Sequence, residues 1–357
     1  MKNLRRLLLP FSLLYGLAVV IRNWLYDSGV LKSRLFAIPV IGVGNLEVGG
    51  AGKSPMTEYL VRLLKQDYKL ATLSRGYGRA TKGFLIAPDS YQGALAAEIG
   101  DEPAQFKHKF PDVTVAVCED RVKGINELRA EHKLIILDDA FQHRAVKPGL
   151  SILLFDYNKL NQPHLLLPAG NLREPFLGRW RADVFVVSKC PANLSAGDQE
   201  KIAAHLEPLP YQALFFSPIA YQPLQNLAGK KSDMTLDADT TVFLLTGIAN
   251  PQPLVQHIKT YTQNIIHHNY PDHHRFSLKN ISKLAAEYTA CTAQKKLVIT
   301  TEKDAQRLLE HDLQQTIGSI PVLVMPVEVS FLNNSGTQFD QLVKEYVREH
   351  SANHIIH

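Results

Sequence analysis

Cysteine is scarce in this sequence, and the few cysteines present are too scattered to form a framework. The 357 residues include three, Cys118, Cys190 and Cys291. An odd and widely spaced set fits reduced thiols in a cytosolic protein rather than disulfides. No spacing of cysteine and histidine matches a zinc site either. A disulfide framework and a zinc-finger-type site are therefore excluded.

A strong charge of one sign is also missing. The formal net charge is +5, the sequence pI is about 8.9, and 20% of the residues are charged. This mildly basic balance fits an anionic ligand or an anionic membrane surface. It is too weak to indicate a nucleic-acid partner, for which the sequence shows no motif. Hydrophobic residues make up 45% of the chain, which is typical of a globular protein long enough for two cores.

The N-terminal apolar run is shorter than an ordinary membrane-spanning helix. Residues 7–21 fall below the roughly 20 apolar residues such a helix needs, and they include Pro10 and Ser12. A signal peptide would have this length, but no A-x-A cleavage site follows. The flanks favour an interfacial helix, with basic residues before the run and aromatic residues after it: Lys2, Arg5, Arg6, Trp24 and Tyr26. We therefore expect residues 1–30 to form a membrane-associated helix; the alternative is a helix buried against its own domain.

Short, continuous apolar runs alternate with helical stretches through the next part of the chain. Such runs suit strands buried on both faces of a parallel sheet, and the helical stretches between them suggest βαβ units. The candidate strands are residues 37–43, 69–73, 113–117, 133–137, 151–155 and 183–188. We expect residues 31–215 to form an α/β domain with a mostly parallel sheet flanked by helices.

A second alternation follows a looser region. After Pro208, prolines and a polar stretch at residues 229–239 suggest a linker or hairpin, assigned to residues 216–240. The expected elements beyond it are strands at 241–245, 296–300 and 322–324, with helices at 253–262 and 305–310. Residues 241–357 are thus predicted to form a smaller C-terminal α/β domain.

A glycine-rich loop joins the first expected strand to an amphipathic helix. Glycines let backbone N–H groups surround phosphate oxygens, and the helix N-terminus adds partial positive charge. In this strand–loop–helix context, Lys53 is expected to neutralise the β- and γ-phosphates, and the Ser54 hydroxyl to ligate Mg²⁺. The residues expected to bind ATP are Glu47, Val48, Gly49, Gly50, Ala51, Gly52, Lys53 and Ser54. The strict motif has glycine in place of Glu47, so this acidic side chain must point away from the phosphates.

An apolar strand that ends in two aspartates supplies the second half of such a site. Residues 134–137 lead directly into Asp138 and Asp139. An aspartate at the carboxyl end of a parallel strand faces the nucleotide crevice and can hold Mg²⁺ directly or through water. The alternative is a helix cap after a strand, which is a common use of aspartate.

Several further motifs, in this order, resemble the tetraacyldisaccharide 4′-kinase family of the lipid A pathway. They are VGN (43–45), GGAGKSP (49–55), SRGYGR (74–79), GDEP (100–103), DDAFQHR (138–144), LPAGNLREP (167–175), YPDH (270–273) and TTEKD (300–304). The departures are small: Glu47 replaces a small or hydroxyl residue, Ser54 the commoner threonine, and Ala140 a common glycine. The resemblance implies Mg²⁺-dependent transfer of the γ-phosphate of ATP to the 4′-hydroxyl of tetraacyldisaccharide 1-phosphate, a lipid-linked disaccharide. It also implies action at the cytoplasmic face of the inner membrane.

The resemblance also implies roles for individual residues. Asp101 matches the family's base and His273 the histidine that helps it, so the site would form between the two domains. Lys53, Asp138 and Asp139 complete the expected catalytic set. The substrate-binding residues implied are Arg75, Arg121, Gln142, His143, Asn171 and Arg173, and the metal ligands are Ser54, Asp139 and Glu174. From the residues alone, Asp101 is instead an N-cap, because Glu102 and Pro103 suit a first helical turn.

Other functions remain open on the residues alone. A P-loop GTPase or metal chaperone would carry an N-K-x-D guanine signature; Ser188 and Lys189 follow a strand, but the aspartate is missing. A nucleotide-binding membrane protein without catalysis would not need Asp101 and His273 to converge. A kinase of a soluble small molecule would leave the N-terminal run unexplained. His267 and His268 match no metal-ligand pattern and are expected to be surface histidines.

Overall fold

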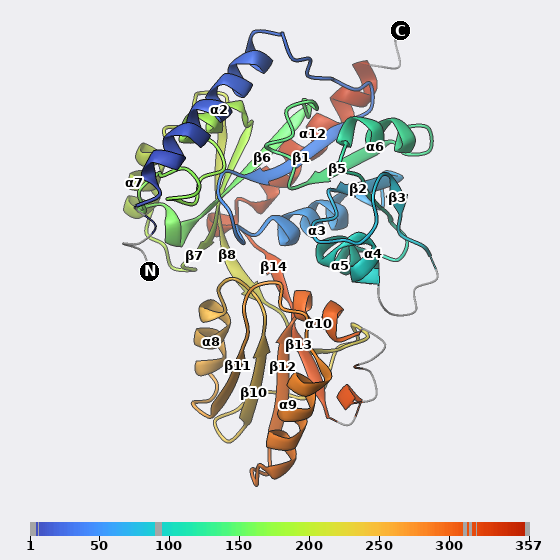
Figure 1. Ribbon diagram of the computed structural model, residues 1–357, viewed down its shortest axis with the longest axis vertical. Coiled ribbons are helices and arrows are strands. Elements are labelled where there is room, and N and C mark those ends of the chain that lie inside the picture. The colour runs from blue at the N-terminus through green and yellow to red at the C-terminus, as the bar shows by residue number, and fades with distance from the viewer. Residues whose placement is uncertain are drawn as a thin grey trace.

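The protein has two α/β lobes, one above the other in Figure 1. The computed structural model describes residues 5, 7–89, 95–309, 313, 316–318 and 320–353. Lys2 and Arg6 of the expected basic flank, and Glu310 at the end of an expected helix, lie outside the described residues. The expected fold class is confirmed: a large, mostly parallel sheet flanked by helices, a second smaller sheet, and an N-terminal apolar helix.

The larger lobe is built on a sheet in the order β14-β8-β7-β6-β1-β5-β2-β4-β3. Neighbouring strands from β8 to β4 are parallel, and the two edge pairs, β14–β8 and β3–β4, are antiparallel. Every residue of β1, β5 and β6 is buried, as expected for central strands covered on both faces. The strands are β1 (Val40–Asn45), β2 (Leu70–Ser74), β3 (Leu85–Ile86), β4 (Thr114–Val117), β5 (Leu134–Asp138), β6 (Leu150–Asp156), β7 (Val184–Cys190), β8 (Ala213–Tyr221) and β14 (Val327–Val329).

Helices cover this sheet and carry much of the candidate site. In α3, residues Met56, Leu60 and Leu64 are spaced on one helical face and are completely buried in the core beneath the sheet. The helices of this lobe are α2 (Leu9–Asp27), α3 (Lys53–Leu64), α4 (Leu95–Ile99), α5 (Asp101–Lys109), α6 (Arg121–Leu128), α7 (Ala196–Leu206) and α12 (Gly336–Asn353), with 3-10 turns η1 (Tyr157–Lys159), η2 (Phe176–Arg181) and η3 (Leu332–Asn334).

The smaller lobe has a sheet in the order β11-β10-β12-β13-β9, parallel except for β9. Its apolar strand residues alternate between two cores, one around Phe243 and Leu245 and one around Leu244 and Ile299. The elements are β9 (Gln225–Asn226), β10 (Thr241–Thr246), α8 (Gln252–Lys259), β11 (Ile265–Asn269), α9 (Leu278–Ala290), β12 (Lys296–Thr301), α10 (Glu302–Leu308) and β13 (Val322–Met325).

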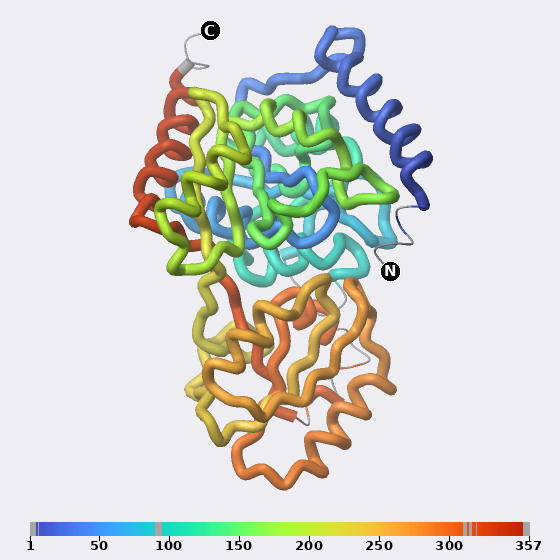
Figure 2. Tube along the Cα trace, turned by 90° about the vertical axis from the view of Figure 1, so that its left-hand side faces the viewer, coloured from blue at the N-terminus to red at the C-terminus, as the bar shows by residue number. Residues whose placement is uncertain are grey.

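The C-terminal segment returns to the larger lobe, which corrects the predicted boundary of the smaller domain at 241–357. Strand β14 pairs with β8, and α12 buries Phe339, Val343 and Val347 in the same core as α3. Figure 2 shows α12 along one side of the larger lobe and α2 along the opposite side. The apolar face of α12 is visible in the sequence, but the core that it joins is set by tertiary packing. The region assigned as linker, 216–240, likewise contains the end of β8 and all of β9.

Candidate active site

The glycine-rich loop lies between β1 and α3, at the carboxyl edge of the larger sheet. Gly49 and Gly52 have φ values of +97° and +84°, a left-handed region that side chains with a Cβ rarely adopt. Gly52 is the N-cap of α3, and within the described residues no side chain caps this helix. Its first backbone N–H groups are therefore available to an anion such as a phosphate.

Lys53 is positioned by two polar partners. Its Nζ donates to Asn45 Oδ1 at 3.0 Å and lies 3.5 Å from Asp139 Oδ1. Arg173 donates to both oxygens of the same Asp139, from Nη1 to Oδ2 at 3.1 Å and from Nη2 to Oδ1 at 2.9 Å. Its Nη2 also donates to Asn45 Oδ1. The structure thus brings together Lys53, Asp139 and Arg173, three residues that sequence analysis placed in the site.

The two aspartates after β5 have opposite electrostatic environments. Burial, together with the charge of Asp139, raises the pKa of the Asp138 carboxyl to about 7; Thr57 Oγ1 donates to it at 3.3 Å. Burial also acts to raise the pKa of Asp139, but Lys53 and Arg173 outweigh it and hold that pKa below its usual value. Asp139 therefore carries the negative charge at neutral pH. This difference suits a site in which one carboxylate neutralises cations and the other can share a proton.

Two lysines and a serine, none of them predicted to belong to the site, donate hydrogen bonds to backbone carbonyls of the glycine-rich loop. Lys189 Nζ donates to Gly50 O and, at 2.8 Å, to Asp156 Oδ2, while Ser188 Oγ donates to Ala51 O. Lys159 Nζ donates to Val48 O at 3.1 Å. Ser188 and Lys189 are among the last residues of β7, and Lys159 lies in η1 just after β6, so all three are at the sheet edge that holds the loop. Their position at or just beyond the carboxyl end of an apolar strand is the signal that could have identified them.

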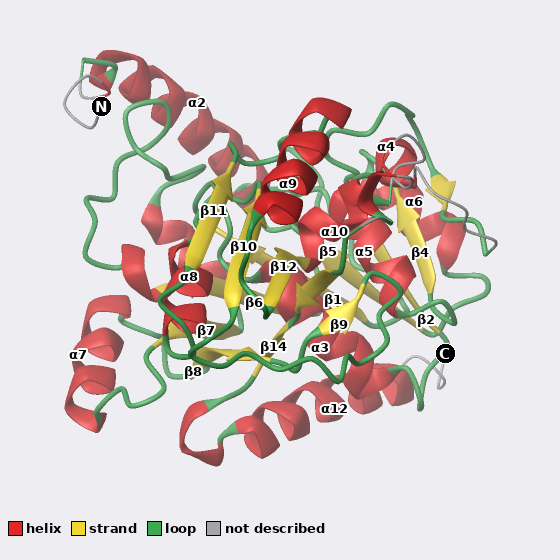
Figure 3. Cartoon of the chain, turned by 90° about the horizontal axis from the view of Figure 1, so that it is seen from below, coloured by secondary structure: helices red, strands yellow, loops and turns green. Residues whose placement is uncertain are grey.

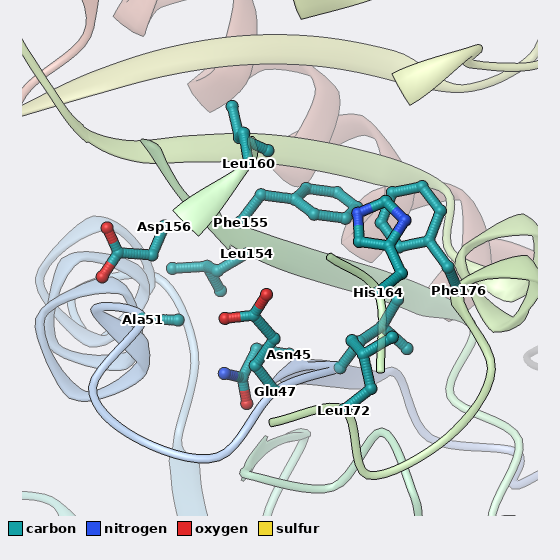
Figure 4. Close-up of a pocket in the computed structure, with 11 residues that line it drawn as sticks. Asn45, Glu47, Ala51, Leu154, Phe155, Asp156, Leu160, His164, Leu172 and Phe176 are labelled. Atoms are coloured by element: carbon teal, nitrogen blue, oxygen red, sulfur yellow. The ribbon is translucent and has the colours of Figure 1, made fainter. Parts of the chain in front are cut away.

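Glu47 turns toward one of these lysines. Its Oε2 lies 3.5 Å from Lys159 Nζ, and burial raises the pKa of its carboxyl. Figure 4 shows Glu47 with Asn45 and Asp156 in a pocket beside the loop, among apolar residues of β6 and the segment that follows it. Glu47 stands where the strict motif has glycine, and the positive charge of Lys159 accommodates its acidic side chain.

A group of polar side chains with unsatisfied atoms lies around this edge. Arg121 is 4% exposed; it donates to Glu119 O at 3.0 Å, while its Nε has no partner within the described residues. In the same part of the chain, Arg173 Nε, Gln142 Oε1 and His143 Nε2 are also buried without a partner. Burial and the charge of Arg121 lower the pKa of His143 to about 4, so His143 is neutral at pH 7. Such atoms suit a polar, anionic ligand.

Glu174, a predicted metal ligand, contacts protein donors through both carboxylate oxygens. Its side chain is completely buried; Oε1 accepts from Gln142 at 2.9 Å and Oε2 from Arg181 at 2.6 Å. Asn23 of α2 donates to the same Oε2 at 3.4 Å. Both oxygens are thus engaged by protein donors, and Glu174 orders Gln142 and α2. Among the described residues, no group of three or more His, Cys, Asp or Glu side chains is arranged to hold a metal ion.

The remaining predicted substrate residues occupy the outer rim of the site. Asn171 Oδ1 accepts from Arg5 at 3.1 Å, and its backbone O accepts from Val48 N, so it links the N-terminal segment to the glycine-rich loop. Arg75 is exposed, and its positive charge acts on both Arg121 and His143. Arg79, in the same segment as Arg75, donates to Glu119 at 2.6 Å.

Asp101 and His273 meet at the junction of the two lobes. His273 Nδ1 lies 3.1 Å from Asp101 Oδ2, and Lys303 Nζ lies 3.1 Å from His273 Nε2. These contacts fit a neutral imidazole that donates from Nδ1 and accepts at Nε2. Asp101 begins α5 but its side chain caps no helix; Gly100 is the N-cap. A pocket opens onto this pair, lined by Tyr77, Gly78, Ala96, Ala97, Asp101, His273, Arg275 and Arg307.

Comparison with known proteins gives matches over almost the whole chain. The family model for tetraacyldisaccharide-1-P 4′-kinase (LpxK) matches residues 4–348. The chain belongs to this family. Among its relatives, a tetraacyldisaccharide 4′-kinase of Phocaeicola vulgatus is 42% identical over 98% of this chain and 97% of its own length. The enzyme of that name from Parabacteroides distasonis is 43% identical over the same shares of the two chains.

A solved structure of the family is similar over almost the whole chain. The "apo" form of LpxK from Aquifex aeolicus, crystallised in complex with ATP, has a TM-score of 0.71 and 30% identity. The match covers 96% of this chain and 99% of the other. The similarity therefore extends over both lobes.

Proposed function

We propose that this protein transfers the γ-phosphate of ATP to the 4′-hydroxyl of tetraacyldisaccharide 1-phosphate, forming lipid IVA. The observation that carries the proposal is the pairing of Asp101 with His273 at 3.1 Å, across the lobes, in a chain that also has a phosphate-binding loop. A phosphate donor site and a candidate base for an alcohol acceptor are the two parts that a kinase of this type needs.

The nucleotide side of the reaction is assigned to the larger lobe. The loop 47–52 and the N-terminus of α3 would surround the phosphates of ATP, and Lys53 would contact the β- and γ-phosphates. Arg121 and Arg173 supply further positive charge, while Gln142 and His143 present polar atoms to the same region. Arg75 and Asn171 would contact the substrates from the rim.

Mg²⁺ fits the donor set at the end of β5. The hydroxyl of Ser54 and the carboxylate of Asp139 would hold it, with Asp138 acting through water. Such oxygen donors, completed by substrate phosphates, are those that Mg²⁺ uses in nucleotide sites. When bound, the ion neutralises charge that develops on the phosphate oxygens during transfer.

On the acceptor side, Asp101 would take the proton of the 4′-hydroxyl as the new O–P bond forms and the bond between the β- and γ-phosphates breaks. His273, hydrogen bonded to the same carboxylate, would orient it and share the proton. The pocket beside Tyr77 and Arg275 would receive the sugar ring.

Membrane binding through α2 would bring the site to a lipid substrate at the cytoplasmic face of the inner membrane. By length and composition, α2 is the one helix among the described residues that could cross a membrane. Its apolar side chains point away from the lobe, with Leu13 75% and Trp24 62% exposed. Both an interfacial and a spanning placement are compatible with this exposure.

A kinase assay tests the assignment. Radiolabelled ATP, Mg²⁺ and detergent-dispersed tetraacyldisaccharide 1-phosphate are incubated with the wild type, Lys53→Ala and Asp101→Asn. We expect transfer by the wild type and a loss of roughly 100-fold or more in each variant. Lys201→Ala, which changes an exposed residue paired with Asp198, is expected to retain wild-type activity. A folded wild type that binds ATP but leaves this acceptor unmodified would falsify the proposed acceptor.

A further inference from the structure

A residue of the smaller lobe contacts the candidate base more closely than His273 does. Arg307, on α10, donates to Asp101 Oδ2 from Nη2 at 2.6 Å and from Nε at 3.1 Å. It is 2% exposed. We propose that Arg307 is a positioning residue of the phosphoryl transfer, which holds Asp101 from the opposite lobe and aims its second oxygen at the acceptor hydroxyl. This inference rests on the proposed function.

The two carboxylate oxygens of Asp101 differ in their hydrogen bonds. The three donors that reach this carboxylate, two from Arg307 and one from His273, all lie on Oδ2. Among the described residues, no hydrogen bond reaches Oδ1 from a side chain or backbone group. Two donors of one planar guanidinium, together with His273, fix the position of Oδ2 better than a single donor would. Oδ1 is therefore the oxygen left to accept the proton of the acceptor.

Arg307 is itself fixed by buried partners. Its Nη1 donates to Asp304 Oδ1 at 2.9 Å and to Gly247 O at 3.0 Å. Asp304 is completely buried and accepts from Gly247 N and from the Thr301 hydroxyl. A buried charge with all its partners in place has little freedom to move. The Thr-Thr-Glu-Lys-Asp segment (residues 300–304) therefore does more than begin helix α10: through Asp304 it also holds Arg307 in place.

The same network places His273. The backbone carbonyl of Gly247 that accepts from Arg307 also accepts from His273 N, at 3.1 Å. His273 has a φ of +59°, a left-handed conformation uncommon for a residue with a Cβ. The Gly247 carbonyl of the smaller lobe therefore helps to place both residues of the pair: His273 directly, and Asp101 through Arg307. Arg307 joins that position to the larger lobe, where Asp101 lies.

The charges around Asp101 and His273 determine the pKa of the Asp101 carboxyl. Burial would raise the pKa of the Asp101 carboxyl, but the hydrogen bonds from His273 and Arg307, with the charges of Arg307 and Lys303, hold it well below its usual range. The charged or titratable groups that face the pair, from every element packed around it, are Tyr77, Glu102, Asp272, Arg275, Lys303, Asp304 and Arg307. Removal of Arg307 takes away the closest cation, so the pKa of Asp101 rises.

The experiment compares Arg307→Lys and Arg307→Gln in the full-length protein. Lysine keeps the charge but loses the two-pronged contact, and glutamine loses both. We expect kcat to fall about 10-fold in Arg307→Lys and about 100-fold in Arg307→Gln, since small displacements of a reacting group have effects of this size. The KM for ATP should stay within about 3-fold of wild type, because Arg307 makes no contact with the glycine-rich loop. The acidic limb of the kcat/KM profile should move to higher pH in Arg307→Gln and stay in Arg307→Lys.

A matched control is a buried arginine outside the site. Arg179 is 3% exposed and pairs with Glu207 at 3.0 Å and with Leu206 O at 2.9 Å. Arg179→Lys and Arg179→Gln should lower the melting temperature as the Arg307 variants do, while leaving the pH profile of the folded fraction unchanged. If Arg307→Gln merely loses activity in proportion to its folded fraction, with the wild-type pH profile, the positioning role is overturned.

Crystal structures of the same variants separate this proposal from the proposed function. In Arg307→Gln we expect the Asp101 carboxylate to rotate away from its wild-type orientation, and in Arg307→Lys to rotate by a smaller amount. An unmoved Asp101 in Arg307→Gln contradicts the inference whatever the substrate is. Absence of transfer by the wild type, with Asp101 rotated in Arg307→Gln, instead overturns the acceptor assignment and leaves the role of Arg307 standing.

Discussion

At the scale of single residues, a buried carboxylate on the phosphate-binding helix has to share its counter-ion. Glu58 of α3 is completely buried and accepts from Lys109 at 2.5 Å and from Gln105 at 2.7 Å. Lys109 also pairs with Glu302 of the smaller lobe. Burial raises the pKa of Glu58 to about 7. The charge of Lys109 acts to lower this pKa, and the charge of Glu302 acts to raise it. Burial acts to lower the pKa of Lys109, but the two carboxylates outweigh it and raise that pKa, so the lysine stays charged.

This arrangement makes folding stability depend on pH in a defined window. The pKa of Glu58 is higher in the folded protein than its ordinary 4.5, so the folded state binds more protons between about pH 4.5 and 7. Its contribution to stability is therefore present below pH 4.5 and is lost as the pH rises through 7. From urea denaturation at several pH values, we expect Glu58→Gln to gain about 1–3 kcal/mol relative to wild type between pH 5 and 8. Glu131→Gln, at an exposed carboxylate, is the control; wild-type and Glu58→Gln curves that stay parallel would contradict the prediction.

At the scale of elements, the buried central strands could be predicted from sequence and the edge strands could not. Strands β1, β5 and β6 are continuous apolar runs, because both faces of the sheet are covered. Strand β11 was missed, because it lies at an edge and only its first two residues are apolar; His267, His268 and Asn269 follow them. Those histidines were expected at the surface. Instead His268 is 8% exposed and 3.2 Å from Glu287, and His267 contacts Thr246.

The candidate site divides in the same way. The glycine-rich loop and the aspartates after β5 are local patterns, so the sequence alone indicated them. Arg307 was missed because its role depends on a contact with Asp101, 206 positions away along the chain. Seen from below in Figure 3, α5 and α10 lie side by side, which no local pattern could have revealed. Asp101 likewise has the sequence context of a helix cap, and its contacts with the other lobe show that its side chain has different partners.

Helix α2 packs with its small and polar residues inward and its apolar residues outward. Ser12 is 5% exposed and bonds to Leu166 O and Ala169 N, and a Cβ on Gly16 would lie 2.7 Å from Leu166. The Tyr15 hydroxyl donates to Arg173 O at 2.7 Å. This orientation argues against the alternative of a helix buried on its own domain. It also links α2 to Arg173, a residue of the candidate site.

The exposed face of α2 is the expected membrane contact. We expect the triple variant Leu13→Gln, Leu17→Gln, Trp24→Gln to bind anionic phospholipid vesicles about 100-fold more weakly in co-sedimentation, because each side chain loses apolar area that lipid would bury. Its melting temperature should stay near that of wild type, since all three side chains are more than half exposed. Leu278→Gln, at an exposed leucine of the smaller lobe, should bind like wild type. Unchanged sedimentation of the triple variant would remove α2 as the anchor.

At the scale of the whole molecule, the two lobes are joined by two neighbouring chain crossings and by one pair of helices. The crossings lie between β8 and β9 and between β13 and β14, and Gln222 N donates to Pro326 O where they run together. Away from them, α5 and α10 exchange three ion pairs: Asp101 with Arg307, Glu102 with Lys303, and Lys109 with Glu302. Because the first of these pairs holds the candidate base, the geometry of the base depends on how the lobes sit together.

The middle ion pair allows this dependence to be tested without touching Asp101 or Arg307. Glu102 and Lys303 are 3.0 Å apart, with about a quarter of each side chain exposed. Lys303→Glu would place two carboxylates in contact, so we expect faster backbone hydrogen exchange in α5 and α10 and a larger radius of gyration in solution scattering. Like-charge contacts at such partly exposed sites cost on the order of 1 kcal/mol, enough to change exchange several-fold.

Reversal of the partner charge should restore the contact. The double variant Glu102→Lys, Lys303→Glu rebuilds the ion pair with its signs exchanged, so its exchange rates and radius should return toward wild type. Lys283→Glu, an equal charge change on the exposed face of α9, should alter neither quantity. If exchange in α5 and α10 stays at wild-type rates in Lys303→Glu, these helices do not hold the lobes together. The positioning of Asp101 would then have to depend on its own contacts with Arg307 and His273 and on the two chain crossings.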